Sequence, residues 1–141
     1  QLRRRIFDPA HAILRREKIM EFYICRHCGN IVTKLTDHKV PVMCCGEKME
    51  LLEAGVTDAA VEKHVPSCSV NGNVVNVQVG STEHPMIDTH WIEWITVETS
   101  QGFQTKWLNP GDSPKASFVL ADSEELKAVY AYCNLHGLWK A

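Results

Sequence analysis

Four of the six cysteines of this 141-residue chain fall within one short stretch near its start. Cys25 and Cys28 form a CxxC pair followed directly by Gly29, and Cys44 and Cys45 stand side by side further along. A CxxC turn lets two thiolates converge on one metal ion. Adjacent residues normally point apart, so the second pair predicts a strained turn if both thiolates bind that ion. The four cysteines therefore predict a small module built around a tetrahedral metal site.

A disulfide cluster and a set of buried free thiols are the alternatives to this metal site. Residues 6–14 are interrupted by Asp8, Pro9 and His11, so they do not form the apolar core of a secretory signal. We therefore expect a reducing, cytoplasmic location, where cysteines bind metal more often than they form disulfides. Iron and zinc both accept four sulfur ligands, so the spacing leaves the choice of metal open.

The chain divides into three parts by charge and pattern. The first 19 residues hold six of the 15 Lys and Arg residues but two of the 17 Asp and Glu residues, which leaves residues 20–141 acidic. Because Met20 opens a segment that resembles a natural start, we expect residues 1–19 to be a leader that is non-native or disordered. The acidic body argues against a nucleic-acid partner. No apolar run approaches the roughly 20 residues needed to span a bilayer.

Residues 20–55 are expected to form the cysteine module, with short strands at 22–24 and 31–35 on either side of the CxxC turn. A segment of about 35 residues buries too little apolar surface to fold alone, so a metal would supply much of its folding free energy.

Residues 56–141 show short alternating segments separated by turn signals, with no long helical period. The turn Asn71-Gly72-Asn73 predicts a hairpin between strands at 67–70 and 74–79. Strands at this spacing are typical of an antiparallel barrel or sandwich, of which the sandwich is favoured. The further strands are expected at 90–98, 103–108, 116–120 and 126–133.

Several metal-binding side chains lie near turns or strand ends of this expected sandwich. Each alone is a weak signal, but one end of a sandwich can bring such loops together. Cys68 stands apart from these motifs, and we expect it to be a small core residue. The candidate ligands are His64, His84, His90, Cys133 and His136.

Three sequence words in this region resemble the superoxide reductase family. They are EKHVP at 62–66, HPM at 84–86 followed by HWIEWI at 90–95, and CNLHGLW at 133–139. The cysteine module ahead of them resembles desulforedoxin, and the two parts together resemble desulfoferrodoxin, the two-iron form of superoxide reductase. The resemblance implies a mainly β fold, in which a small rubredoxin- or desulforedoxin-like metal module precedes an immunoglobulin-like antiparallel β-sandwich.

The resemblance also implies two iron sites. Cys25, Cys28, Cys44 and Cys45 would hold one iron as Fe(Cys)4, where zinc is an alternative occupant. In the second site, Fe(His)4Cys, Glu62 would bind in the oxidised state and Lys63 would lie near the open coordination position. The implied ligands of that site are His64, His84, His90 and His136 in a plane, with Cys133 on the axis.

The implied activity is one-electron reduction of superoxide to hydrogen peroxide, as a defence against oxidative stress in an anaerobic or microaerophilic organism. A rubredoxin-like carrier or a flavoprotein would supply electrons, and the resemblance implies a homodimer. A non-catalytic electron carrier, in which both irons shuttle electrons, is the second hypothesis. A zinc-stabilised structural protein is the third.

Overall fold

The computed structural model describes residues 19–141, so the leader expected at 1–19 lies outside the described residues except for Ile19. The chain divides into two compact units between Glu50 and Leu51. We call them the cysteine module and the sandwich. The regular secondary structure of both is almost entirely β-strand, which confirms the expected mainly β fold. In the part of the chain that the structure describes, no helix has the length and apolarity that a membrane crossing requires.

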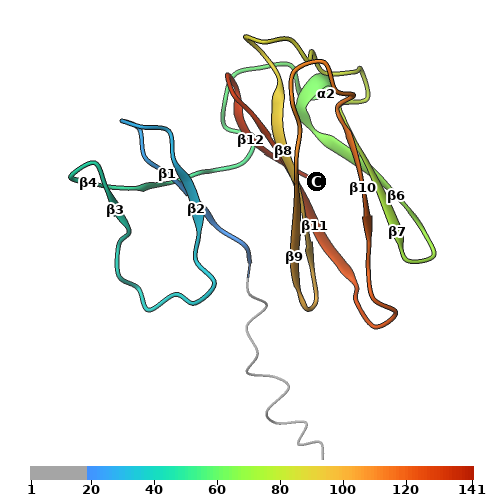
Figure 1. The fold of residues 1–141 in the computed structure, drawn as a ribbon, viewed down its shortest axis with the longest axis horizontal. Helices are drawn as coiled ribbons and strands as arrows, with labels where there is room; N and C mark the ends of the chain where they lie inside the picture. The colour runs from blue at the N-terminus through green and yellow to red at the C-terminus, as the bar shows by residue number, and fades with distance from the viewer. Residues whose placement is uncertain (1–18) are drawn as a thin grey trace, which may run out of the picture. The chain divides into compact units, whose positions relative to one another are not determined.

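The cysteine module consists of very short strands (Figure 1). One sheet has the order β2-β1-β5, and β3 and β4 form a separate hairpin. Its buried apolar side chains include Phe22, Ile24 and Met49, which is a small core for an independent unit. The strands are β1 (Phe22–Ile24), β2 (Ile31–Thr33), β3 (Met43–Cys44), β4 (Glu47–Lys48) and β5 (Glu50–Leu51).

The sandwich consists of two antiparallel sheets (Figure 1). One contains β6 (Pro66–Asn71), β7 (Val74–Val79) and β10 (Lys115–Val119) in the order β10-β7-β6. The other has the order β12-β11-β8-β9 and contains β8 (Ile92–Thr99), β9 (Gly102–Trp107), β11 (Leu126–Cys133) and β12 (Gly137–Lys140). Every strand expected in this unit is present, and β12 is an additional one.

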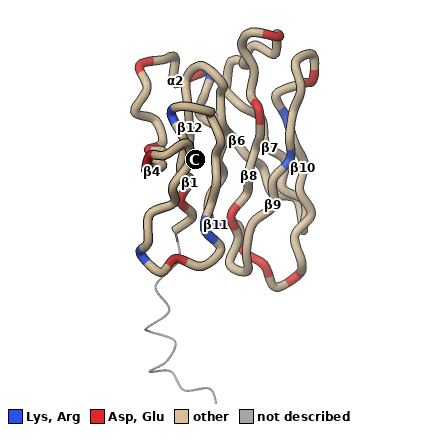
Figure 2. The backbone as a smooth tube through the Cα atoms, turned by 60° about the vertical axis from the view of Figure 1, so that its left-hand side comes forward, with Lys and Arg blue, Asp and Glu red and all other residues tan. Residues whose placement is uncertain are grey.

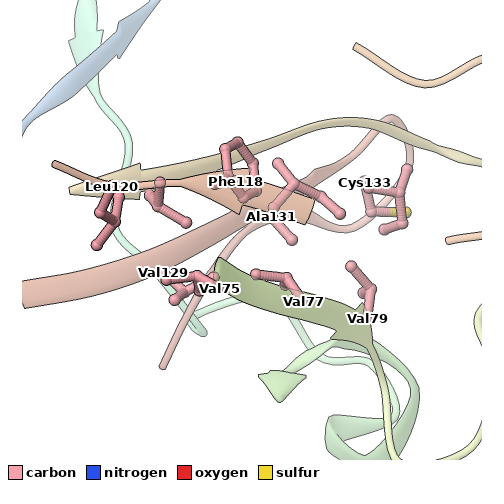
Figure 3. Close-up of a cluster of buried hydrophobic side chains, with 11 residues drawn as sticks. Val75, Val77, Val79, Phe118, Leu120, Val129, Ala131 and Cys133 are labelled. Atoms are coloured by element: carbon pink, nitrogen blue, oxygen red, sulfur yellow. The ribbon is translucent and has the colours of Figure 1, made fainter. Parts of the chain in front are cut away.

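The core of the sandwich lies between the two sheets (Figure 3). Strand β7 alternates as expected, with Val75, Val77 and Val79 buried and Asn76 exposed. In Figure 3, Cys133 lies at the same end of the core as Val79. The core cluster also contains Ile92, Ile95, Val97, Phe118, Leu120, Val129 and Ala131.

The expectation that Cys68 is a small core residue is wrong, because its side chain is exposed. Cys68 lies on β6, an edge strand of its sheet. Its neighbour across the ladder is Val77 on the central strand β7, which takes the buried position. An edge strand has a neighbour on one side only, so its side chains are covered less well.

A single helical turn, α2 (Val61–His64), precedes β6. Val65 is already extended, as the residue before a proline tends to be, so the helix ends at His64. The loop after β7 packs closely against this turn. There the N–H of Gly80 donates to the carbonyl of Val65 (3.1 Å), and the N–H of Thr82 donates to that of Glu62 (3.0 Å).

Gly80→Ala should destabilise the sandwich far more than an ordinary glycine substitution. Gly80 has a φ of +82°, and a Cβ there would lie 2.3 Å from the Thr82 carbonyl oxygen and 2.7 Å from that of Lys63. We expect the free energy of unfolding to fall by more than about 2 kcal/mol, measured by denaturant titration.

Gly72→Ala is the matched control, because Gly72 also has a positive φ (+60°) but has no atom within 4 Å of the added Cβ. It should cost about 1 kcal/mol, from backbone strain alone. Equal losses in the two variants would show that the close approach at Gly80 is unimportant.

Candidate metal centres

The four cysteines of the module lie together, with their sulfur atoms within 4.8 Å of one another. The Sγ atoms of Cys28 and Cys44 are 3.6 Å apart, and those of Cys44 and Cys45 are 4.0 Å apart. Sulfurs that share one tetrahedral ion at about 2.3 Å lie about 3.8 Å from one another. No cysteine among the described residues is in a disulfide. The arrangement therefore fits a metal ion bound by four thiolates.

The CxxC turn directs backbone N–H groups at sulfur. The N–H of Cys28 lies 3.5 Å from the Cys25 sulfur, and it is the main cause that lowers the pKa of Cys25 to about 6. Contact with the Cys28 thiol is the main cause that raises the pKa of Cys44 and of Cys45. The crowded sulfurs therefore resist ionising together, and a cation bound by all four removes that conflict.

The adjacent cysteines are accommodated by a tight hairpin. Cys44 pairs with Glu47 across β3 and β4, so Cys45 and Gly46 form a two-residue loop. Both have positive φ, +51° and +76°, as a type I′ turn requires. Cys45 occupies a position where asparagine or glycine is usual, which carries about 1 kcal/mol of backbone strain. The strained turn predicted for the adjacent cysteines is therefore found at Cys45.

A second set of candidate ligands meets at one end of the sandwich, and we call it the histidine–cysteine cluster. His64 ends α2, His84 and His90 lie in the connection from β7 to β8, Cys133 ends β11, and His136 lies just before β12. The donor atoms of the first four lie within 4.8 Å of one another. The Nδ1 atom of His136 is 3.0 Å from His64 Nε2 and 3.8 Å from Cys133 Sγ.

The four imidazole rings of the cluster form a square. Neighbouring rings have centroids 4.7–5.0 Å apart and are nearly perpendicular, with interplanar angles of 78–86°. The opposite rings of His64 and His90 are 6.3 Å apart. Two imidazoles that bind one ion from opposite sides have centroids about 6.5 Å apart, given metal–nitrogen bonds of about 2.1 Å. The square therefore has the size of a metal site.

Backbone carbonyls determine which ring nitrogen faces the centre. Nδ1 of His64 lies 2.7 Å from the Ala60 carbonyl oxygen, and Nδ1 of His84 lies 2.6 Å from that of Pro85. A carbonyl only accepts, so each Nδ1 carries the proton and each Nε2 carries a lone pair. These two Nε2 atoms nevertheless lie 3.2 Å apart. Two acceptors so close repel each other unless they share a cation.

His90 provides a further test of the fit to a metal. Its Nε2 atom is buried and has no hydrogen-bond partner among the described residues. Buried polar atoms of folded proteins nearly always have a partner, so this atom indicates a missing ligand. Burial is the main cause that lowers the pKa of the His64, His84 and His90 rings, to about 4 for His84. Neutral imidazoles are the form that binds metal.

Cys133 is fully buried beside the ring square. Burial raises the pKa of its thiol, and the N–H groups of His136 and Leu135, aimed at its sulfur, oppose that rise. Metal binding would have to displace the thiol proton. A cluster of four neutral imidazoles and one thiolate would thus contribute a single negative charge.

A β-bulge near the start of β8 places Ile92, two residues after His90, opposite Cys133. On β8, Trp94 pairs with Tyr132, but Ile92 rather than Glu93 pairs with Cys133. Ile92 and Ile95 consequently both lie in the core, which a regular strand with its period of two forbids. Because Glu93 is an extra residue on β8, the residues before it are shifted by one position relative to their partners on β11.

Glu62 and Lys63 stand directly before His64 on α2, and both are exposed. The structure places no side-chain atom of either among the converging ligand atoms of the cluster. The charge of Lys63 nevertheless reaches it, adding to burial in lowering the pKa of His64 and His90. The carbonyl of Glu62 accepts from Thr82 N–H and from Ser81 Oγ (3.2 Å), which anchors the turn.

Two residues next to the cluster received no role from the sequence. The ring of Trp139 stacks on His64, with centroids 4.9 Å apart, and its Nε1 donates to the His136 carbonyl (3.1 Å). Asn134 bonds to both neighbours of His90. Both belong to the word CNLHGLW, so their presence beside two ligands was the available signal.

The chain is similar to several known proteins. The family model described as desulfoferrodoxin matches residues 56–141. A desulfoferrodoxin homolog of Archaeoglobus fulgidus is 45% identical over 125 residues, which cover 88% of this chain and 98% of that protein. The desulfoferrodoxin of Nitratidesulfovibrio vulgaris is 46% identical over 121 residues, which cover 86% of this chain and 94% of that protein.

A solved structure is similar over most of the chain. The crystal structure of the superoxide reductase from Treponema pallidum is 32% identical, covers 88% of this chain and 99% of that chain, and has a TM-score of 0.75. Together with the family match and the identities above 40%, these findings show that the chain belongs to the desulfoferrodoxin family.

Proposed function

We propose that the protein is a superoxide reductase, an oxidoreductase that converts superoxide, one electron and two protons into hydrogen peroxide as an oxidative-stress defence. The observation that carries this proposal is the square of four imidazoles with the buried Cys133 thiol beside it. The similarity to the Treponema pallidum superoxide reductase supports it.

The histidine–cysteine cluster would hold the catalytic iron. Its ligands are His64, His84, His90, His136 and Cys133. Bound iron would supply the single electron by cycling between its ferrous and ferric states. The cluster provides one negative charge, so a divalent ion in it keeps a net positive charge that attracts an anion. The buried Cys133 sulfur would donate electron density to the bound ion, as a thiolate ligand does in some haem enzymes.

Lys63 and Glu62 would act at the approach to the cluster. Acidic positions are spread over the described chain (Figure 2), so attraction of superoxide depends on local cations. Lys63 carries an exposed ammonium one residue from His64, where it can steer superoxide and orient a proton-donating water. We assign Glu62 the role of an additional ligand in the oxidised state.

The cysteine module would hold the second iron, with Cys25, Cys28, Cys44 and Cys45 as ligands and zinc as an alternative occupant. That iron would relay electrons or stabilise the module. A rubredoxin-like or flavoprotein donor, a homodimeric assembly and a cytoplasmic location in an anaerobe or microaerophile belong to the same proposal.

The purified protein should produce one hydrogen peroxide for each superoxide consumed, when reductant is in excess and catalase is absent. This ratio follows because every electron comes from the reductant. Peroxide and superoxide would be measured together after metal analysis. One peroxide for every two superoxide ions would mean dismutation. No acceleration over buffer in iron-loaded protein would favour the electron-carrier hypothesis.

Substitution of single cysteines should remove the two metal ions separately. Cys133→Ser should lower the metal content of the histidine–cysteine cluster only, and Cys28→Ser that of the cysteine module only, because the two donor sets share no residue. Cys68→Ser is the control, since this thiol lies in neither group, and it should retain both ions. Elemental analysis with absorption spectra checks this. Full metal content in Cys133→Ser would contradict the ligand assignment.

Lys63→Ala should slow the bimolecular reaction with superoxide about tenfold at low ionic strength and flatten its salt dependence. Pulse radiolysis measures this rate. Lys127→Ala is the control, because Lys127 lies near the start of β11 and Cys133 at its end, about 20 Å away. Equal rates for Lys63→Ala and the wild type would remove Lys63 from the mechanism.

A further inference from the structure

Asn134 connects the two segments that carry three members of the histidine–cysteine cluster. It follows Cys133 and precedes His136 by two residues. Its Oδ1 accepts from the Trp91 N–H (2.9 Å), and its Nδ2 donates to the Thr89 carbonyl (3.1 Å). Its own N–H donates to the Trp91 carbonyl (3.2 Å). Asn134 therefore bonds to both chain neighbours of His90.

These bonds begin where the regular ladder stops. The pairing of β8 with β11 ends at Ile92 and Cys133, directly beside the bulge at Glu93. The main-chain groups of His90 bond to Ile87, in their own loop, with both distances 3.0 Å. These bonds fix the shape of that loop but do not attach it to β11. Asn134 provides the attachment, on the residues either side of His90.

The chemistry of this attachment suits asparagine. One short side chain must accept from a backbone N–H and donate to a backbone carbonyl two residues away. A carboxylate of the same size only accepts and would face the Thr89 carbonyl with a negative charge. Alanine does neither. Asn134 is half-buried, so bonds lost there are replaced by water less completely than at the surface.

We propose that Asn134 is a positioning residue that holds His90 in the ring square against Cys133 before metal binds, and thereby raises the metal affinity of the cluster. The inference rests on the proposed function, because it assumes that the cluster binds a metal. Outer residues that orient metal ligands typically change affinity 10- to 100-fold when they are substituted. The atom whose position matters is the buried Nε2 of His90, which has no hydrogen-bond partner within the part of the chain that the structure describes.

The test compares Asn134→Ala and Asn134→Asp with Asn73→Ala in the full-length protein. Asn73 also joins distant segments, through its Nδ2 bond to Asp122. It lies at the β6–β7 turn, at the opposite end of the sandwich from α2 (Figure 1). The control therefore removes a comparable hydrogen bond away from the cluster.

Two readouts separate positioning from general stability. In the metal-free protein, nuclear Overhauser contacts from the His90 ring to the rings of His84 and His136 report the square directly. Co²⁺ titration, followed by the shifted imidazole protons of the cluster, reports its affinity. Asn134→Ala should lose the ring contacts and bind Co²⁺ about 10- to 100-fold more weakly. Asn134→Asp can keep the bond from Trp91 but repels the Thr89 carbonyl, so it should also weaken both readouts relative to the wild type. Asn73→Ala should match the wild type in both readouts.

The outcomes distinguish this inference from the proposed function. Wild-type protein that binds no Co²⁺ at the cluster would overturn the proposed function and the inference with it. If the wild type binds Co²⁺, then unchanged ring contacts and affinity in Asn134→Ala would overturn the inference alone. Equal weakening in Asn73→Ala would also overturn it, by showing a general effect of stability. If Asn134→Ala fails to fold, wild-type contacts and affinity in Asn134→Asp would overturn it.

Discussion

Nitrogen lone pairs that face one another are the interaction on which the histidine–cysteine cluster depends. The Nδ1 protons of His64 and His84 are committed to carbonyl oxygens, so their Nε2 atoms meet at 3.2 Å as two acceptors. His90 adds a buried ring nitrogen without a partner among the described residues. A cation at the centre would turn these repulsions into bonds, and metal affinity would then be part of the stability of the fold. A similar conflict exists between the sulfur atoms of the cysteine module, because contact between the thiols raises the pKa of Cys44 and of Cys45.

The residues of the histidine–cysteine cluster come together because of where the helical turn and the strands of the sandwich begin and end. Cys133 is the last residue of β11 and remains in the core, while the hairpin that follows returns His136 beside it within three residues. The single turn α2 ends before Pro66, which places His64 at the start of β6. A close backbone approach at Gly80 then holds the loop after β7 against that turn. The candidate ligands therefore come from loops and from the ends of α2 and β11, and the strands determine where each of these segments begins or ends.

The sequence predicted what depends on local pattern. The strands of the sandwich and the hairpin at Gly72 follow from alternation and turn chemistry, and they are present. The square of rings could not be derived from spacing, because it depends on contacts between residues as far apart as His64 and His136. Exposure of Cys68 was missed because a sequence does not show which strand lies at an edge. Strand β12 was missed because it is short and begins with a glycine. Asn134 was overlooked because its partners lie about 43 residues away.

The bulge at Glu93 has a consequence for comparing and transplanting this site. Ile92 and Ile95 share the core at an odd spacing, so a simple alternation rule, counted back from Ile95, puts Ile92 on the wrong face of β8. A relative that lacked this extra residue would pair the residue before Trp94, rather than Ile92, with Cys133, and the loop that carries His90 would begin one position later on the strand. A designer who grafts the five ligands onto another immunoglobulin-like sandwich must therefore copy the inserted residue as well. The insertion is as much a part of the binding motif as the imidazoles, although it binds nothing itself.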